Sequence, residues 1–239
     1  AEAAAHSERL AAHIHALIAA AGGWISFASF MEQALYAPGL GYYSAGTAKF
    51  GAAGDFVTAP EISALFGRAL ARQVAQGLDS VGGDVLELGA GSGRLACDLL
   101  LALEQQGHLP DRYLILELSA ELKARQLATI QKHALHLLER VTWLDHIPDA
   151  FRGVILGNEV LDALPLHLVL RRAGDFFERG VVSKGGGFAW QDQPLTYPAL
   201  REAALALELP DDYLIEMNRA APALIATLAE KMEAGLMLF

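Results

Sequence analysis

The sequence predicts an α/β protein built on a Rossmann-like, doubly wound and mostly parallel sheet with helices on both faces. Three observations predict this fold class. Short apolar segments alternate with helical segments between residues 84 and 156, which is the pattern of successive βαβ units. A glycine-rich turn over 89–93 follows the first apolar segment. The chain of 239 residues is long enough to bury a core without a disulfide, and its single cysteine, Cys97, allows none within the chain.

The expected elements follow in chain order. A helix is expected over 1–21, loops and turns rich in aromatic residues and glycine over 22–60, and a helix that begins near Pro60 and continues beyond residue 71. Strands are then expected at 84–88, 112–118, 141–144 and 153–156, with helices at 95–106 and 121–138. A β-hairpin over 181–190, helices over 199–208 and 219–233, and the opening of another strand at 235–239 complete the chain.

These elements suggest two parts. Residues 1–75 form an N-terminal helical and loop cover, which includes the segment Gly54-Asp55-Phe56, and residues 76–239 form the core, with the hairpin inserted near 166–198. The apolar run at 235–239 resembles the beginning of a buried strand rather than a frayed tail. We therefore expect the native protein to continue past Phe239, so that the sequence is truncated at its C-terminal end.

Composition argues against several classes of partner. The net charge of -10 leaves few cations for the phosphates of a nucleic acid. No apolar run approaches the roughly 18 residues of a membrane-spanning helix, and the N-terminus lacks the basic start of a secretory signal. No Cys/His spacing suggests a metal site. We expect a cytoplasmic protein with neither a nucleic acid nor a membrane as partner, while the oligomeric state is left open.

The glycine-rich turn predicts a cofactor site, because ligands of doubly wound sheets bind beyond the carboxyl ends of the strands. Its spacing is GxGxG, through Gly89, Ala90, Gly91, Ser92 and Gly93. A dinucleotide-binding turn has GxGxxG, and Arg94 stands at the position of the third glycine. S-adenosylmethionine carries no phosphate and presents an amino acid and a sulfonium, which suits the preceding carboxylate, Glu87. The alternative is a tight strand-to-helix turn with no ligand.

Two further strand ends carry acidic residues. Glu117, followed by Leu118, ends the second strand, where a carboxylate can accept hydrogen bonds from both ribose hydroxyls. Asp145 follows the third strand, where the adenine edge would lie. The alternative is that both acids are solvated ends of strands.

Several longer segments resemble the MidA-like class I S-adenosylmethionine-dependent methyltransferases, whose mitochondrial member acts in complex I assembly as a protein arginine methyltransferase. The resemblance spans nearly the whole chain. It depends on the following segments: Leu35-Tyr36, Gly41-Tyr42-Tyr43, Gly54-Asp55-Phe56-Val57-Thr58-Ala59-Pro60-Glu61, residues 87–93, Glu117-Leu118-Ser119 and Asn158-Glu159-Val160-Leu161-Asp162-Ala163-Leu164-Pro165. The resemblance implies S-adenosylmethionine as cofactor and a protein partner as substrate, as a respiratory complex I subunit is for the mitochondrial relatives.

The residues that follow the fourth strand are the expected catalytic group. Glu159 and Asp162 are expected to orient the acceptor, since carboxylates hold a guanidinium and accept its proton, and Asn158 is expected to line the site. The alternatives are a helix cap for Asp162 and an ion pair for Glu159.

The segment before the helix at Pro60 is expected to close over the ligands. Asp55 is expected near the acceptor, with Gly54, Pro60 and Glu61 beside the cofactor; a purely structural turn at 54–55 is the alternative.

The sequence leaves four functions in competition. The leading one is methylation of a protein side chain, with arginine as the acceptor. A methyltransferase for a small molecule and a non-catalytic assembly factor that binds the cofactor are the others that fit the motifs. A nicotinamide oxidoreductase is disfavoured by Arg94. Fold class alone does not decide among them.

Overall fold

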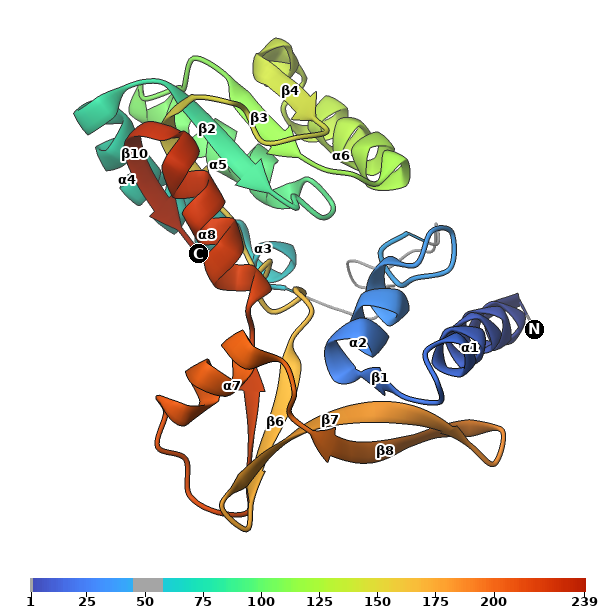
Figure 1. Ribbon diagram of the computed structural model, residues 1–239. Coiled ribbons are helices and arrows are strands. Elements are labelled where there is room, and N and C mark those ends of the chain that lie inside the picture. The colour runs from blue at the N-terminus through green and yellow to red at the C-terminus, as the bar shows by residue number, and fades with distance from the viewer. Residues whose placement is uncertain (1, 45–57) are drawn as a thin grey trace. The chain divides into compact units, whose positions relative to one another are not determined.

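The computed structural model describes residues 2–44 and 58–239, and the chain forms two compact units (Figure 1). The first unit contains residues 1–46 and 162–224, and the second contains residues 47–161 and 225–239. These limits differ from the expected division after residue 75, because each unit is assembled from two separate stretches of chain.

The second unit is an α/β sandwich that confirms the predicted fold class. Its described strands form one sheet in the order β10-β5-β2-β3-β4, and every neighbouring pair is parallel. The strands are β2 (Asp84–Leu88), β3 (Tyr113–Leu116), β4 (Val141–Leu144), β5 (Phe151–Leu156) and β10 (Met232–Leu238). The helices are α3 (Ala59–Ile62), α4 (Ala64–Val81), α5 (Arg94–Gln106), α6 (Ala120–His133), the 3-10 helix η1 (Leu135–Arg140) and α8 (Ala220–Lys231), of which residues 225–231 belong to this unit.

The order of the strands creates a switch point between β2 and β5. The chain leaves β2 in one direction to build β3 and β4, then returns to the other side of β2 to build β5 and β10. Right-handed crossovers that run in opposite directions place their helices on opposite faces of the sheet, α5 and α6 on one and α8 on the other. A doubly wound sheet binds its ligands at this point, beyond the carboxyl ends of the strands.

The core of the second unit lies between the sheet and helices α4 and α5. Val74, Ala96, Leu99 and Leu103 are fully buried against strand residues such as Val154. The predicted strands 84–88 and 141–144 are confirmed without change. β2 lies inside the sheet and is buried along its whole length, whereas β4 is an edge strand whose Thr142 is exposed. The predicted helix 121–138 ends at His133, and the chain continues as the 3-10 turn η1.

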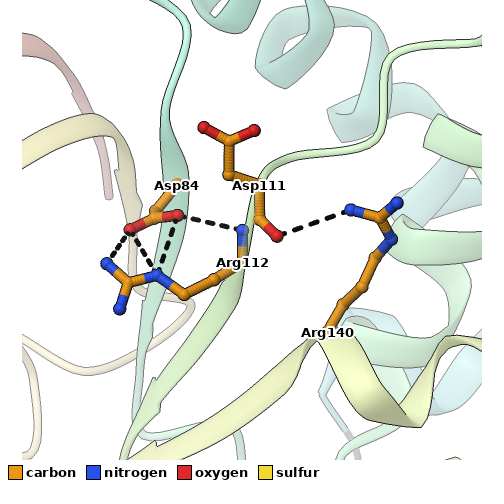
Figure 2. Close-up of polar contacts among 4 residues, drawn as sticks. All are labelled: Asp84, Asp111, Arg112 and Arg140. Atoms are coloured by element: carbon orange, nitrogen blue, oxygen red, sulfur yellow. Dashed lines mark hydrogen bonds and ion pairs between the residues drawn. The ribbon is translucent and has the colours of Figure 1, made fainter.

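The amino-terminal edge of this sheet is held by polar contacts (Figure 2). Asp84, at the start of β2, accepts hydrogen bonds from the Arg112 backbone N–H at 2.9 Å and from its guanidinium Nη2 at 2.6 Å. Arg140 donates to the carbonyl oxygens of Pro110 and Asp111 at 3.0 and 3.4 Å. These contacts join the beginnings of β2, β3 and β4 at the edge opposite the switch point.

The described part of the first unit is an antiparallel sheet with three helices, and residues 220–224 of α8 also belong to this unit. Its described strands are β1 (Ile25–Ser26), β6 (His167–Arg172), β7 (Asp175–Lys184), β8 (Gly187–Pro194) and β9 (Tyr213–Met217), in the order β1-β7-β6-β9 with β8 also on β7. The helices are α1 (Glu2–Ala20), α2 (Phe27–Tyr36) and α7 (Pro198–Leu205). In Figure 1 β7 and β8 form a long two-stranded ribbon. Its turn, Gly185-Gly186, has φ of +58° and +80°, which suits the right-handed twist of the strands.

One prediction for this unit was wrong, and another was confirmed only in part. Residues 27–36 were expected as loop but form α2, because Ser26 caps the helix by accepting from the Ser29 N–H and no glycine or proline interrupts the segment before Pro38. The inserted hairpin is longer than the expected 181–190, and it belongs to a larger sheet through β6 and β9, which the sequence pattern did not predict.

One more expected element was too long. The helix that begins near Pro60 is interrupted at Ser63, whose extended backbone ends α3 and whose hydroxyl accepts from the Leu65 N–H to begin α4. Over the two described ranges, no helix combines the length and apolar character that crossing a membrane requires.

Candidate cofactor and acceptor site

The candidate site of the second unit lies at the switch point of its sheet. The glycine loop, residues 89–93, follows β2, and residues 157–161 follow the neighbouring strand β5, which pairs with β2 from Asp84 to Glu87. The two loops touch, since a Cβ atom built on Gly89 would lie 3.5 Å from Val160 Cγ2. Topology therefore brings together two of the segments that the sequence analysis selected.

The glycine loop has a backbone that other residues rarely adopt. Gly89, Gly91 and Gly93 have φ of +60°, +54° and +82°. Gly93 is the N-cap residue of α5 and has no side chain to cap the helix. The Arg94 N–H binds the Ser92 hydroxyl, and the N–H groups that follow it in the first turn carry no cap from Gly93 and can face a ligand. Ala90 is buried and its carbonyl accepts from the Gly93 N–H at 2.8 Å, which closes the turn.

Helix α3 brings a carboxylate to this loop. The Ser92 hydroxyl donates to Glu61 Oε1 and accepts from the Arg94 N–H. Pro60 is buried in the first turn of α3, next to Glu61, so the helix start is anchored. The structure thus joins Glu61 and Ser92, both predicted to lie beside the cofactor.

Glu117 follows β3 and is also buried, with 8% of its surface exposed. Its Oε1 accepts from the Ser119 N–H at 2.9 Å and its Oε2 from Gln126 Nε2 at 3.0 Å. The next residue, Leu118, is an apolar side chain that is 78% exposed. A fixed carboxylate beside an exposed apolar side chain offers a polar and an apolar contact to the same ligand.

The other predicted acids have different surroundings. Asp145, after β4, is hydrogen-bonded to Lys123 of α6, and this bond lowers the pKa of its carboxyl. Glu87 lies inside the core, where it accepts from the Tyr113 hydroxyl at 2.7 Å. Burial raises the pKa of Glu87 to about 7, and the bond from Tyr113 opposes this shift. Glu87 of β2 and Tyr113 of β3 thus form a hydrogen-bonded pair in the core.

The residues after β5 lie beside an apolar cavity. Asn158 is half-buried and lines a cavity of about 330 Å³ together with Phe66, Leu95, Met237 and others. Glu159 is exposed and has a φ of +53°, in the left-handed region.

Asp162, Gly54 and Asp55 are the remaining predicted site residues. Asp162 belongs to the first unit and is exposed, while Gly54 and Asp55 lie outside the described residues. Within 2–44 and 58–239, no group of three or more His, Cys, Asp or Glu side chains is arranged to hold a metal ion.

Two polar residues beside this site, Gln126 and Trp143, were not predicted from the sequence. Gln126 is fully buried in α6, where it contacts the glycine loop, Glu117 and the Trp143 indole of β4. One signal could have revealed it: Leu122, Gln126 and Ile130 share one helical face, and an amide between two core residues requires polar partners.

Comparisons with known proteins identify the family of this chain. The model of Methyltransf_28, a family of S-adenosyl-L-methionine-dependent methyltransferases, matches residues 69–239. The crystal structure of a COG1565 superfamily member from Burkholderia thailandensis, bound to S-adenosyl-homocysteine, is 46% identical with a TM-score of 0.93, over 98% of this chain and 62% of that chain. A native structure of a COG1565 protein from the same organism is 45% identical with a TM-score of 0.89, over 98% and 61%.

Curated relatives are more distant. The mitochondrial protein arginine methyltransferase NDUFAF7 homolog of Caenorhabditis elegans is 33% identical over 64% of this chain and 41% of its own length. The human protein arginine methyltransferase NDUFAF7 is 30% identical over 61% and 38%. The matched parts thus amount to 41% and 38% of these two relatives. These findings confirm the resemblance to the MidA-like proteins: the chain belongs to the Methyltransf_28 family of methyltransferases, and its cofactor is S-adenosyl-L-methionine.

Proposed function

We propose that this protein transfers the methyl group of S-adenosylmethionine to an arginine side chain of a protein partner. The observation that carries the proposal is Glu159, an exposed carboxylate held in a left-handed backbone conformation directly after β5. The names of the relatives from Caenorhabditis elegans and human support the arginine acceptor. We also propose a cytoplasmic location, with which the single, unpaired cysteine is compatible.

The residues of the second unit fit the cofactor. Glu117 keeps lone pairs for ribose hydroxyls, and Leu118 offers an apolar surface to the adenine, whose edge would face Asp145. The N–H groups that follow Arg94 in the first turn of α5 suit a carboxylate, and Glu61 suits an amino group. When bound, S-adenosylmethionine supplies a methyl group on a sulfonium, which an acceptor takes by in-line displacement.

An arginine acceptor places demands on the protein that a neutral nucleophile does not. Its guanidinium is protonated at neutral pH, so it must be held in one orientation and must lose a proton as the new N–C bond forms. A carboxylate performs both tasks, by accepting bidentate hydrogen bonds and by accepting the proton. We assign these tasks to Glu159, and to Asn158 the positioning of the acceptor beside the apolar cavity.

The backbone of Glu159 supports this assignment. A residue other than glycine with φ of +53° costs about 1–3 kcal/mol, and such residues persist where the surrounding structure holds them, often at active sites. The Glu159 side chain is exposed, so its packing in the core does not explain the left-handed backbone conformation.

The test is methyl transfer from cofactor labelled in the methyl group to proteins of a bacterial cell extract, followed by acid hydrolysis and amino-acid analysis. Label in methylarginine is the expected result. Glu159→Gln should bind S-adenosylhomocysteine as the unchanged protein does and lower the rate of transfer about 100-fold or more, as expected when a general base is removed.

Glu208→Gln is the matched control, since Glu208 is another exposed glutamate with positive φ, 48°, in the first unit. It should leave the transfer rate unchanged. Label in another amino acid would contradict the arginine acceptor, and full activity of Glu159→Gln would remove Glu159 from the mechanism.

The apolar cavity beside Asn158 favours a second candidate, methylation of a small molecule with an apolar part. Label that passes through an ultrafiltration membrane, which retains proteins, would identify a small-molecule acceptor. Saturable binding of cofactor with label in neither fraction would favour the assembly factor.

A further inference from the structure

The buried amide of Gln126 connects three segments of the candidate cofactor site. Its Nε2 donates to Glu117 Oε2 at 3.0 Å and to the Gly91 carbonyl oxygen at 3.2 Å. Its Oε1 accepts from Trp143 Nε1 at 2.8 Å. The side chain is fully buried, so these contacts replace water for each of its polar atoms.

Trp143 determines which way this amide points. An indole N–H can only donate, so the amide oxygen must face Trp143. The amide nitrogen is then left facing Glu117 and Gly91, where both of its N–H groups find acceptors. A rotation of the amide by 180° would place two donors against the indole and an oxygen against a carboxylate. Gln126 therefore has one favourable orientation.

We propose that Gln126 is a positioning residue that holds the Glu117 carboxylate and the glycine loop in the geometry that the cofactor requires. The proposal rests on the cofactor site described under Proposed function. Gln126 affects the cofactor by holding Glu117 and Gly91 in place. Its hydrogen bond with Trp143 fixes the orientation of the Gln126 amide.

The hydrogen bonds of Glu117 show what this positioning achieves. A carboxylate has about four lone-pair sites. The Ser119 N–H takes one site on Oε1 and Gln126 takes one on Oε2, so each oxygen keeps a site for one of the two ribose hydroxyls. Without Gln126 the carboxylate can rotate, and one oxygen must find another donor before the ribose binds.

The glycine loop is fitted to the same residue. A Cβ atom on Gly93 would lie 2.9 Å from Gln126 Cα and 3.2 Å from its carbonyl oxygen. The backbone of α6 at Gln126 thus limits the approach of the loop, while its amide binds the Gly91 carbonyl. Loop and carboxylate are positioned relative to one helical residue.

The test compares two ligands by calorimetry: S-adenosylhomocysteine and its 2′,3′-dideoxy analogue, which lacks the hydroxyls assigned to Glu117. We expect Gln126→Met to weaken binding of the first by about 10- to 100-fold, the value of a hydrogen bond to a charged group. The analogue should lose much less affinity. Gln126→Glu, which keeps an acceptor for Trp143 but places a second carboxylate beside Glu117, should show the same selectivity.

The matched control is Gln131→Met, because Gln131 is an exposed glutamine of the same helix. It should bind both ligands as the unchanged protein does. Thermal unfolding without ligand checks the fold of each variant. In NMR spectra, the chemical shift of the Trp143 indole N–H should change in Gln126→Met, which removes its acceptor, and should remain that of a hydrogen-bonded N–H in Gln126→Glu. Glutamate has nearly the volume of glutamine, so Gln126→Glu provides the test if Gln126→Met does not fold.

Glu117→Ala separates two ways of failing. In the first case, Glu117→Ala removes the preference for the ligand with ribose hydroxyls, but the Gln126 variants lower the affinity for both ligands equally or for neither. Glu117 then remains a cofactor residue, and the positioning role of Gln126 is overturned. If Glu117→Ala keeps the preference, the assignment of Glu117 fails and the proposal for Gln126 fails with it.

Discussion

At the scale of single residues, Glu87 shows how far the surroundings decide the role of a carboxylate. It precedes the glycine loop in sequence, yet its side chain points into the core and accepts from Tyr113. Because burial raises its pKa to about 7, a large share of the Glu87 carboxyl is neutral at physiological pH. Its attraction for a cationic ligand is correspondingly weaker than that of Glu61 or Glu117, which stay near the loop.

Glu87 predicts a pH dependence of stability. Its pKa rises from an unfolded value of 4.5 to about 7 in the folded chain, so the folded state binds more protons between these values. The free energy of unfolding should therefore fall as pH increases from 4.5 to 7, by on the order of 3 kcal/mol, and level off above 7. Glu87→Gln should remove this fall. Urea denaturation of both proteins between pH 5 and 8 measures it, and parallel curves would contradict it.

At the scale of elements, helix α5 begins and ends with a left-handed glycine. Gly93 and Gly107 have φ of +82° and +76°. A Cβ atom on Gly107 would meet nothing within 4 Å, whereas one on Gly93 would press on the Gln126 backbone. The two ends of one helix thus separate the cost of backbone conformation from the cost of a clash.

We predict that Gly107→Ala lowers the free energy of unfolding by about 1–2 kcal/mol, the penalty of the left-handed region, and leaves binding of S-adenosylhomocysteine unchanged. Gly93→Ala should lower it further and weaken binding at least 10-fold, since α6 and the loop must move apart. Urea unfolding and calorimetry measure both effects. Equal decreases in the free energy of unfolding of the two variants would show that the contact of Gly93 with Gln126 does not contribute to stability.

Strand β5 depends on another glycine. Gly153 has φ of +135°, and a Cβ atom there would lie 1.9 Å from the Asp84 backbone oxygen. The backbone of a strand cannot move aside as a flexible side chain can. Gly153→Ala should therefore lower the free energy of unfolding by about 3 kcal/mol or more, or prevent folding. Gly187→Ala in β8, where the nearest atom lies at 3.9 Å, should change the free energy of unfolding by less than about 1 kcal/mol. Circular dichroism during denaturation compares them.

At the scale of the whole molecule, the two edges of the parallel sheet have different tasks. The amino-terminal edge holds the ion pair of Asp84 and Arg112, whose nearest atoms are 2.6 Å apart (Figure 2). The carboxyl edge holds the glycine loop, Glu117 and the residues after β5. Stability and ligand binding should therefore respond to different substitutions.

Asp84→Asn tests this separation. It removes a charge that is largely buried but whose partner is 64% exposed, so we expect a modest loss, about 1–2 kcal/mol in the free energy of unfolding. The affinity for S-adenosylhomocysteine should not change, because Asp84 lies at the opposite end of β2 from the loop. A matching loss of affinity would show that the two edges are coupled.

The sequence by itself determined the type and order of the elements of the parallel sheet and the position of the glycine loop. Apolar runs, helical periodicity and glycine spacing are local signals, so strands 84–88 and 141–144 could be predicted from their own residues. The end of the second strand predicted Glu117 as a cofactor residue, and the family resemblance added Glu61. The structure joins Glu61 to Ser92 and Glu117 to Gln126.

Only the tertiary structure decided which polar groups meet. The burial of Glu87 beside Tyr113, the contact of Gln126 with three segments, and the assembly of each unit from two stretches of chain all bring together residues far apart in sequence. Such contacts depend on the order of strands in a sheet and on the face that each helix presents to it. A local pattern does not encode them, because side-chain environment is set by packing between elements.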